Sequence, residues 1–198
     1  MKINSKQLLS DDYEISKEFL SFIDTMDENA AVLNEKGKII FVNKAWIEFA
    51  QSNDMTWDNY GLEEDYLKTM KDVKGEDAET ARKAAEGIEA VLAGERDNFT
   101  LEYPCHSHEK DYWFKLKAKV FAENKAVVMH EDITETRKMK EEIKEKNRLL
   151  EGVLNNIPDI IGIQKPDHTI MRYNKAGYEQ LDMPPEDIKG QKCYKLLG

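Results

Sequence analysis

Apolar and polar residues alternate in three stretches between positions 98 and 130, which is the pattern of strands with one buried face. The stretches are 99–105, 112–121 and 126–129, and polar turns separate them. We therefore predict three consecutive antiparallel strands. In the first strand Cys105 shares the apolar face with Tyr103, so it is expected to be a small buried hydrophobic residue.

Residues 77–93 follow a different period, because their apolar side chains recur at intervals of three and four. The positions on this face are Ala81, Ala84, Ala85, Ile88, Val91 and Leu92. The spacing predicts a helix that ends near Gly94. A shorter helix is predicted after Asn43, where Trp46, Phe49 and Ala50 share one face.

The region before these elements is repeated later in the chain at an offset of 131 residues. Asn43-Lys44-Ala45 recurs as Asn174-Lys175-Ala176. In each copy an apolar helical tail, an apolar run, a polar turn and a second apolar run precede the asparagine. Gly, Pro and Asp in the turns are typical of a hairpin connection. Each copy is therefore predicted to be a helix, a hairpin and a helix.

The order of these elements predicts an α+β fold. Two strands, several helices and three further strands would form a five-stranded antiparallel sheet with helices on one face. We divide the chain into an N-terminal segment (1–15), a complete domain (16–134), a linker helix (135–156) and the opening part of a second domain (157–198). Because the second copy has no counterpart of the three later strands, we expect the chain to be a piece of a longer protein.

The linker carries a heptad pattern. Intervals of four and three residues separate Met139, Ile143, Lys146, Leu150, Val153 and Ile157. Such a stripe predicts a coiled coil, here a parallel homodimer whose seam contains Met139, Ile143, Leu150 and Val153. The alternative is an amphipathic helix that lies on its own domain. In either arrangement the stripe needs an apolar partner.

Composition and charge exclude several classes of partner. Of the 198 residues, 34% are charged, and 39 acidic residues against 29 Lys and Arg give a net charge of −10. A strongly acidic chain is a poor partner for nucleic acid or anionic membranes. No run approaches the ~20 apolar residues of a spanning helix, and the first residues lack the apolar run of a signal peptide. We expect a cytoplasmic protein without direct membrane insertion.

Residues 16–134 resemble a PAS domain, a sensory module of bacterial and archaeal signalling proteins. The features that carry the resemblance are the hairpin at Gly37, Asn43-Lys44-Ala45-Trp46, the helix before Gly94, and Asp132-Ile133-Thr134, which is similar to the Asp-x-Thr signature between a PAS sheet and its output helix. Residues 87–107 are similar to a subgroup found in sensor histidine kinases, and residues 153–198 resemble the opening of a second PAS domain. The resemblance implies the N-terminal part of a multi-PAS, sensor histidine kinase-like protein.

The resemblance also implies a ligand cavity between the sheet and its helices. Candidates for its lining are Trp46, Phe49, Tyr66, Tyr103, Cys105 and Trp113. Aromatic residues also fill cores of this kind, so core packing is the alternative. Asp132 and Thr134 are the candidate signal relay: the Thr134 hydroxyl would cap the linker helix and Asp132 would hold the end of the strand. The alternative is a plain N-cap that conveys no signal.

Two known PAS cofactors are disfavoured by the residues present. A photoactive flavin domain of this family needs a cysteine in the helix after Trp57, and residues 57–73 contain none. A haem domain usually carries its histidine ligand on the long helix, and residues 76–96 contain no histidine. The resemblance therefore names no cofactor, and the ligand is unknown at this point.

Metal binding and catalysis are also disfavoured. Cys105, His106, His108 and His130 carry suitable ligand atoms, but the first two are consecutive on a strand and point to opposite faces. His130-Glu131 is similar to the phospho-accepting pair of histidine kinases, yet it ends a strand instead of lying on an exposed helix. No P-loop, Gly-x-Ser-x-Gly or His-Glu-x-x-His motif occurs. We expect neither a metal site nor catalytic residues in this chain.

Together these observations predict a sensory input module. Binding of a small ligand or partner would be relayed through the dimeric linker to an output domain, most simply the histidine kinase of a two-component system. One alternative is a ligand-free PAS module that serves only as a dimerisation scaffold. Another is the PAS input of a non-kinase regulator, such as a diguanylate cyclase or a transcription factor.

Overall fold

The chain folds into two compact units, the first ending at Glu135 and the second beginning at Thr136. The computed structural model describes residues 15–53, 58–106, 111–122 and 124–196. Apart from Ile15, the predicted N-terminal segment therefore lies outside the described residues.

The first unit is built on a five-stranded antiparallel sheet, as the alternation predicted. Its strands are β1 (Asn29–Leu33), β2 (Ile39–Val42), β3 (Asn98–His106), β4 (Asp111–Ala122) and β5 (Lys125–Asp132). They are arranged in the order β2-β1-β5-β4-β3, and every neighbouring pair is antiparallel. The last strand in sequence thus lies at the centre, between the first hairpin and the two longer strands.

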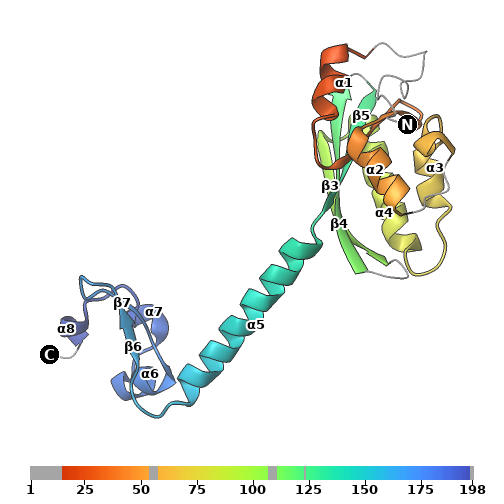
Figure 1. Cartoon of the computed structure of the whole chain (residues 1–198). Coiled ribbons are helices and arrows are strands. Elements are labelled where there is room, and N and C mark those ends of the chain that lie inside the picture. The colour runs from red at the N-terminus through yellow and green to blue at the C-terminus, as the bar shows by residue number, and fades with distance from the viewer. Residues whose placement is uncertain (1–14, 54–57, 107–110, 123, 197–198) are drawn as a thin grey trace. The chain divides into compact units, whose positions relative to one another are not determined.

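Three helices cover one face of this sheet (Figure 1). They are α2 (Lys44–Ser52), α3 (Tyr66–Lys71) and α4 (Ala78–Leu92), and a short 3-10 helix, η2 (Asp58–Gly61), precedes α3. The predicted apolar face of α4 is buried from Ala84 to Leu92. We did not predict α3, because six residues are too few to display a helical period.

The opposite face of the sheet carries a smaller layer, which the prediction of helices on one face did not include. α1 (Lys17–Ile23) packs there, with Ile23 against Phe41. The rings of Phe19 and Phe121 stack with centroids 3.6 Å apart. All residues of β2 and all but the first of β1 are buried. Since successive strand residues point to opposite faces, these strands need a covering layer on both sides.

α5 (Thr134–Asn156) is one helix of 23 residues, which confirms the predicted linker helix. The elements that follow it are β6 (Gly162–Gln164), β7 (Ile170–Tyr173), α6 (Lys175–Leu181), α7 (Pro185–Ile188) and α8 (Cys193–Leu196). β6 and β7 form the predicted second hairpin. In the part of the chain that the structure describes, no helix has both the length and the apolarity needed to cross a bilayer.

Two asparagines confirm the predicted repeat, because they make the same set of hydrogen bonds in the two units. The Asn43 amide oxygen accepts from the backbone nitrogens of Ala30 (2.9 Å) and Trp46 (3.0 Å). Its nitrogen donates to backbone carbonyls of the preceding loop and helix end. Asn174 bonds to the backbone groups that lie 131 residues later: Ile161, Gly177, Leu154, Ile157 and Asp159. An amide suits this position because it both accepts and donates.

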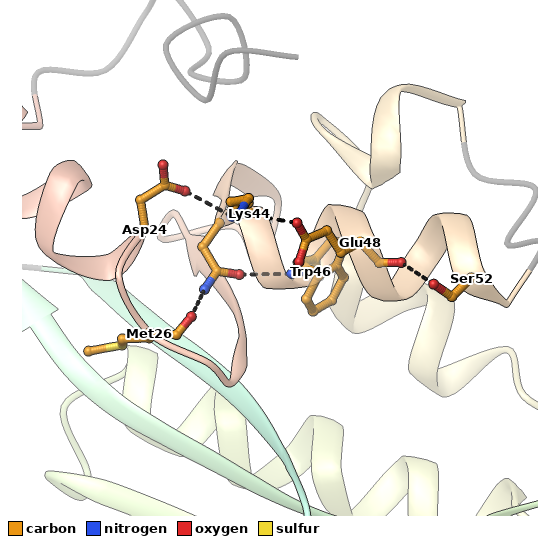
Figure 2. Close-up of polar contacts among 7 residues, drawn as sticks. Asp24, Met26, Lys44, Trp46, Glu48 and Ser52 are labelled. Carbon is orange, nitrogen blue, oxygen red and sulfur yellow. Dashed lines mark hydrogen bonds and ion pairs between the residues drawn. The ribbon is translucent and has the colours of Figure 1, made fainter. Parts of the chain in front are cut away.

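This network holds the loop before β1 against the start of α2. Figure 2 shows Asp24 and Met26 of the loop beside Lys44 and Trp46 of the helix. The Asp24 carboxylate accepts a hydrogen bond from the Lys44 backbone nitrogen at 2.8 Å, and Asn155 has the corresponding role in the second unit. The fixed start of α2 places the Trp46 side chain in the core between helix and sheet.

Candidate functional site

A cavity of about 350 Å³ lies between the sheet and helices α2, α3 and α4 of the first unit. Buried side chains of Tyr66, Phe114 and His130 form part of its floor. Asp77 and Cys105 lie at its mouth and are exposed. Small-molecule sites in proteins typically have volumes of roughly 300–1,000 Å³, so the cavity is large enough for a small ligand.

Three polar side chains of the cavity form one hydrogen-bonded chain, which we call the Tyr-His-Tyr triad. The Tyr66 hydroxyl lies 2.7 Å from Nε2 of His130, and the Tyr103 hydroxyl lies 2.6 Å from Nδ1 of the same ring. Tyr66 is the first residue of α3, and its backbone nitrogen donates to the carbonyl of Gly37 in the β1–β2 turn. Tyr103 and His130 come from β3 and β5, so packing of α3 on the sheet assembles the triad.

Burial keeps the triad uncharged at neutral pH. Loss of solvation lowers the pKa of His130 to about 4. Burial likewise raises the pKa of Tyr66 and, with a further contribution from the neighbouring Tyr66, that of Tyr103. At the mouth, partial burial and then the Asp77 carboxylate raise the pKa of the Cys105 thiol. Among the described lining residues, Asp77 is the one with a carboxyl side chain, and none is a lysine or an arginine.

The structure places five of the six predicted lining residues around this cavity: Trp46, Phe49, Tyr66, Tyr103 and Cys105. Trp46 and Tyr66 also belong to the hydrophobic core, so for these two residues lining and core packing are not exclusive. The indole nitrogen of Trp46 donates to the backbone carbonyl of Tyr60 at 3.1 Å. Its contribution to the cavity is therefore an apolar wall.

Two predictions about the lining were wrong. Trp113 lies outside the cavity, because alternation along β4 directs Phe114 toward the helices and Trp113 to the other face. Cys105 is exposed instead of buried. It lies on β3, which is an edge strand, at the mouth of the cavity, so solvent reaches the thiol.

The sequence reasoning missed His130, which is the central residue of the triad. It was read as the end of a strand and assigned no role in the cavity. A signal for it exists, because Ala126, Val128 and His130 alternate along β5 and the first two face the helices. Continuing that alternation by one step brings the imidazole into the cavity.

The joint between the sheet and α5 contains both residues of the predicted relay, but their roles are exchanged. The Asp132 carboxylate accepts a hydrogen bond from the backbone nitrogen of Thr134, the first residue of α5, at 2.8 Å. The Thr134 hydroxyl, which we had expected to cap the helix, accepts from the backbone nitrogen of Trp113 on β4 at 2.9 Å. Trp113 also accepts from the Ile133 nitrogen at 2.8 Å. β4 therefore holds the start of α5 directly.

The side chains of the predicted dimer seam all lie on the surface of α5. Met139, Ile143 and Leu150 are each 59% exposed, and Val153 is 54% exposed. The apolar stripe is available to a partner.

No group of three or more metal-ligating side chains occurs among residues 15–53, 58–106, 111–122 and 124–196. Of the residues considered for a metal site, His130 is hydrogen-bonded to two tyrosines through both ring nitrogens. His108 and the side chain of His106 lie outside the described residues.

Comparison with known proteins identifies the family. One PAS-domain model matches residues 17–84 and a second matches residues 158–198. An uncharacterised 104.1 kDa protein of Rhodobacter capsulatus, encoded in the hypE 3′ region, is 39% identical over 118 residues. That match covers 57% of this chain and 12% of the relative, so the chain spans only a small part of the relative's length.

Similar solved structures include the PAS domain of BvgS from Bordetella pertussis (14% identity, TM-score 0.41, covering 68% of this chain and 93% of that one). A domain of a sensory box sensor histidine kinase/response regulator from Geobacter sulfurreducens also has 14% identity and a TM-score of 0.41, covering 58% and 91% of the two chains. Both TM-scores are below 0.5, so the assignment to a family rests on the sequence matches and not on these structures. The two model matches together span more than half of the chain, and the chain belongs to the PAS family of signal-sensing input domains.

Proposed function

We propose that the cavity of the first unit binds a small ligand, and that α5 relays its occupancy, as a homodimeric coiled coil, to an output domain such as a histidine kinase. The observation that carries this proposal is the cavity, which has apolar walls, a polar triad and an open mouth. A module that only dimerises has no use for such a triad, because burying polar groups costs free energy unless every one is paired.

The route from the cavity to α5 is short. Phe114 lines the cavity, and the residue before it on β4, Trp113, holds the start of α5 through its backbone hydrogen bonds to Ile133 and Thr134. Phe114 is also paired with Asp132 in the β4–β5 register. A ligand that moves Phe114 therefore displaces the joint, and a rotation or register change of α5 would carry the signal onward.

Ligand binding is tested by native mass spectrometry and an absorption spectrum of the purified chain. A bound mass that is lost in Ala81→Leu is expected, since Ala81 lines the cavity on α4. Ala90→Leu is the matched control, because Ala90 lies on the same helix, is also half-buried and is not a lining residue. If the chain carries no bound mass and binds nothing from a library of small molecules, the scaffold alternative replaces this proposal.

The relay is tested at Thr134. In the complete protein, Thr134→Ala should uncouple the output, such as autophosphorylation from ATP, from the ligand while leaving ligand affinity unchanged. Thr134→Ser retains the hydroxyl and should restore coupling. Thr136→Ala makes the same substitution at an exposed position of α5 and should have no effect. Equal loss of affinity and output in Thr134→Ala would contradict the relay.

The dimer is tested by light scattering. Pairing two copies of the seam would bury the exposed side chains of Ile143, Leu150 and their neighbours, at about 25 cal/mol for each Å² removed from water. Leu150→Lys should dissociate the dimer, because it places a charge in the seam. Leu149→Lys, at an exposed leucine outside the seam, should dissociate it far less. A monomer at tens of micromolar would contradict the coiled coil.

A further inference from the structure

The Tyr-His-Tyr triad contains one more hydrogen than it uses. Each tyrosine hydroxyl has one hydrogen and a neutral imidazole has one, which makes three, whereas the two contacts of His130 require two. In one of the contacts the imidazole must donate, and the tyrosine there keeps its own hydrogen. In the described part of the chain, neither hydroxyl has a second hydrogen-bond partner. One hydroxyl hydrogen therefore lacks an acceptor.

The tautomer of His130 decides which tyrosine keeps the spare hydrogen. With the proton on Nε2, it belongs to Tyr66, which is only 4% exposed. With the proton on Nδ1, it belongs to Tyr103; both tyrosines line the cavity, but Tyr103 is half-buried and is the more exposed of the two. A buried donor without an acceptor costs more free energy than a donor whose acceptor can be supplied by a guest in the cavity. The arrangement with the spare hydrogen on Tyr103 is therefore favoured.

The rest of the lining restricts the charge of a guest. No lysine or arginine belongs to the described lining, so an anion would be buried without a counter-ion. The Asp77 carboxylate lies at the exposed mouth, where water solvates it. Around the triad the walls are the aromatic rings of Trp46, Phe49 and Phe114. An uncharged, largely apolar molecule suits this environment.

We propose that the ligand is an uncharged, largely apolar molecule that accepts a hydrogen bond from the Tyr103 hydroxyl through a carbonyl oxygen or an aromatic nitrogen. This inference rests on the proposed ligand-binding function of the cavity, and it adds the chemical class of the ligand. His130 is then a positioning residue, because its Nδ1–H bond to the Tyr103 oxygen orients the hydroxyl hydrogen toward the guest.

Two probes of the same shape test the proposal: quinoline, which has an aromatic nitrogen, and naphthalene, which has none. Their dissociation constants are measured at pH 7.5 by NMR titration, with the Trp46 indole signal as reporter, on protein shown by native mass spectrometry to be free of bound molecules. The quantity of interest is the ratio of the two constants in each variant, because the ratio removes the difference in hydrophobicity between the probes.

Tyr103→Phe should shift the ratio about tenfold toward naphthalene, since it removes one hydrogen bond to the guest. Tyr66→Phe leaves the spare hydrogen in place and should retain the wild-type ratio. Tyr112→Phe, whose hydroxyl is not part of the lining, should also retain it.

The possible failures are distinguishable. If both probes bind but Tyr103→Phe leaves the ratio unchanged, the inferred acceptor is wrong while the ligand-binding function stands. If the ratio shifts in Tyr66→Phe instead, the assignment of the hydrogen to Tyr103 is wrong. If neither probe binds the wild-type chain, the inferred ligand class is wrong; the ligand-binding function falls with it only if the chain also carries no bound mass and binds nothing from the library.

Discussion

Acidification should destabilise the first unit through His130. The ordinary pKa of this group is 6.5, and burial lowers its pKa in the folded chain to about 4. Between these values the unfolded chain binds a proton that the folded chain does not bind, so the free energy of unfolding falls as pH falls. Stability is complete above pH 6.5 and is progressively lost down to pH 4. At about 1.4 kcal/mol for each pH unit, the loss reaches about 3 kcal/mol at pH 4.

Urea unfolding followed by tryptophan fluorescence measures this loss of stability in the first unit. All three tryptophans lie in the first unit, so the signal reports on that unit alone. The wild-type chain is compared at each pH with His130→Gln, which cannot take up a proton at this position. His168→Gln is the control, because His168 is exposed in the turn of the second hairpin.

The carboxylates of this acidic chain also titrate in the same range, and the comparison removes their contribution. The wild type and His168→Gln should lose about 3 kcal/mol more between pH 7 and pH 4 than His130→Gln loses. The absolute stability of His130→Gln does not matter, since only its pH dependence enters. Equal losses in all three proteins would show that His130 is not held neutral by burial, and the hydrogen count in the triad would then fail with it.

Three further substitutions test the packing. Gly87→Ala should destabilise the first unit by about 1–3 kcal/mol, although alanine favours helices, because its Cβ would lie 2.4 Å from the Phe99 ring. Urea unfolding measures this loss, and an unchanged unfolding midpoint would contradict the packing of Phe99 on Gly87. Gly152→Ala should stabilise α5 locally by up to ~1 kcal/mol, because alanine favours helices and its Cβ would meet nothing within 4 Å. Hydrogen exchange of the neighbouring amides should become correspondingly slower, and faster exchange would refute this. Asn43→Ala should lower the stability of the first unit by about 3 kcal/mol or more, since it leaves the buried Ala30 nitrogen and further backbone groups without hydrogen-bond partners. A loss below about 1 kcal/mol would show that water replaces the side-chain amide.

The strands and the repeat were predictable because each rests on a strong local rule. Alternation fixes which residues of β3, β4 and β5 share a face, since a slip of one residue would turn every apolar side chain to the solvent. The recurrence of Asn43 as Asn174 was visible as letters alone. The hydrogen bonds explain why it is asparagine: the position must accept from two backbone nitrogens and donate to backbone carbonyls.

The candidate site was predictable only in part, because its decisive features depend on contacts between distant residues. No local pattern shows that Tyr66 would begin a short helix and meet His130, 64 positions later in the sequence. Trp113 was assigned to the cavity because it is aromatic, although its own strand's alternation directs it away. The roles of Asp132 and Thr134 were exchanged because the partner of the threonine hydroxyl is a backbone group on another strand.

The two units share a scaffold but not a site. Gly177 stands where the first unit has Trp46, and a Cβ there would already lie 2.8 Å from Tyr173. Cys193 stands where the first unit has Tyr66, since both backbone nitrogens donate to the same position of the hairpin turn. The asparagine network thus holds the same hairpin and helix start in both units, while two of the side chains that shape the first cavity are absent from the second. Under the proposed ligand-binding function, a ligand that contacts Trp46 and Tyr66 in the first unit would meet Gly177 and Cys193 at the corresponding positions of the second, so the two units would not bind it through the same contacts.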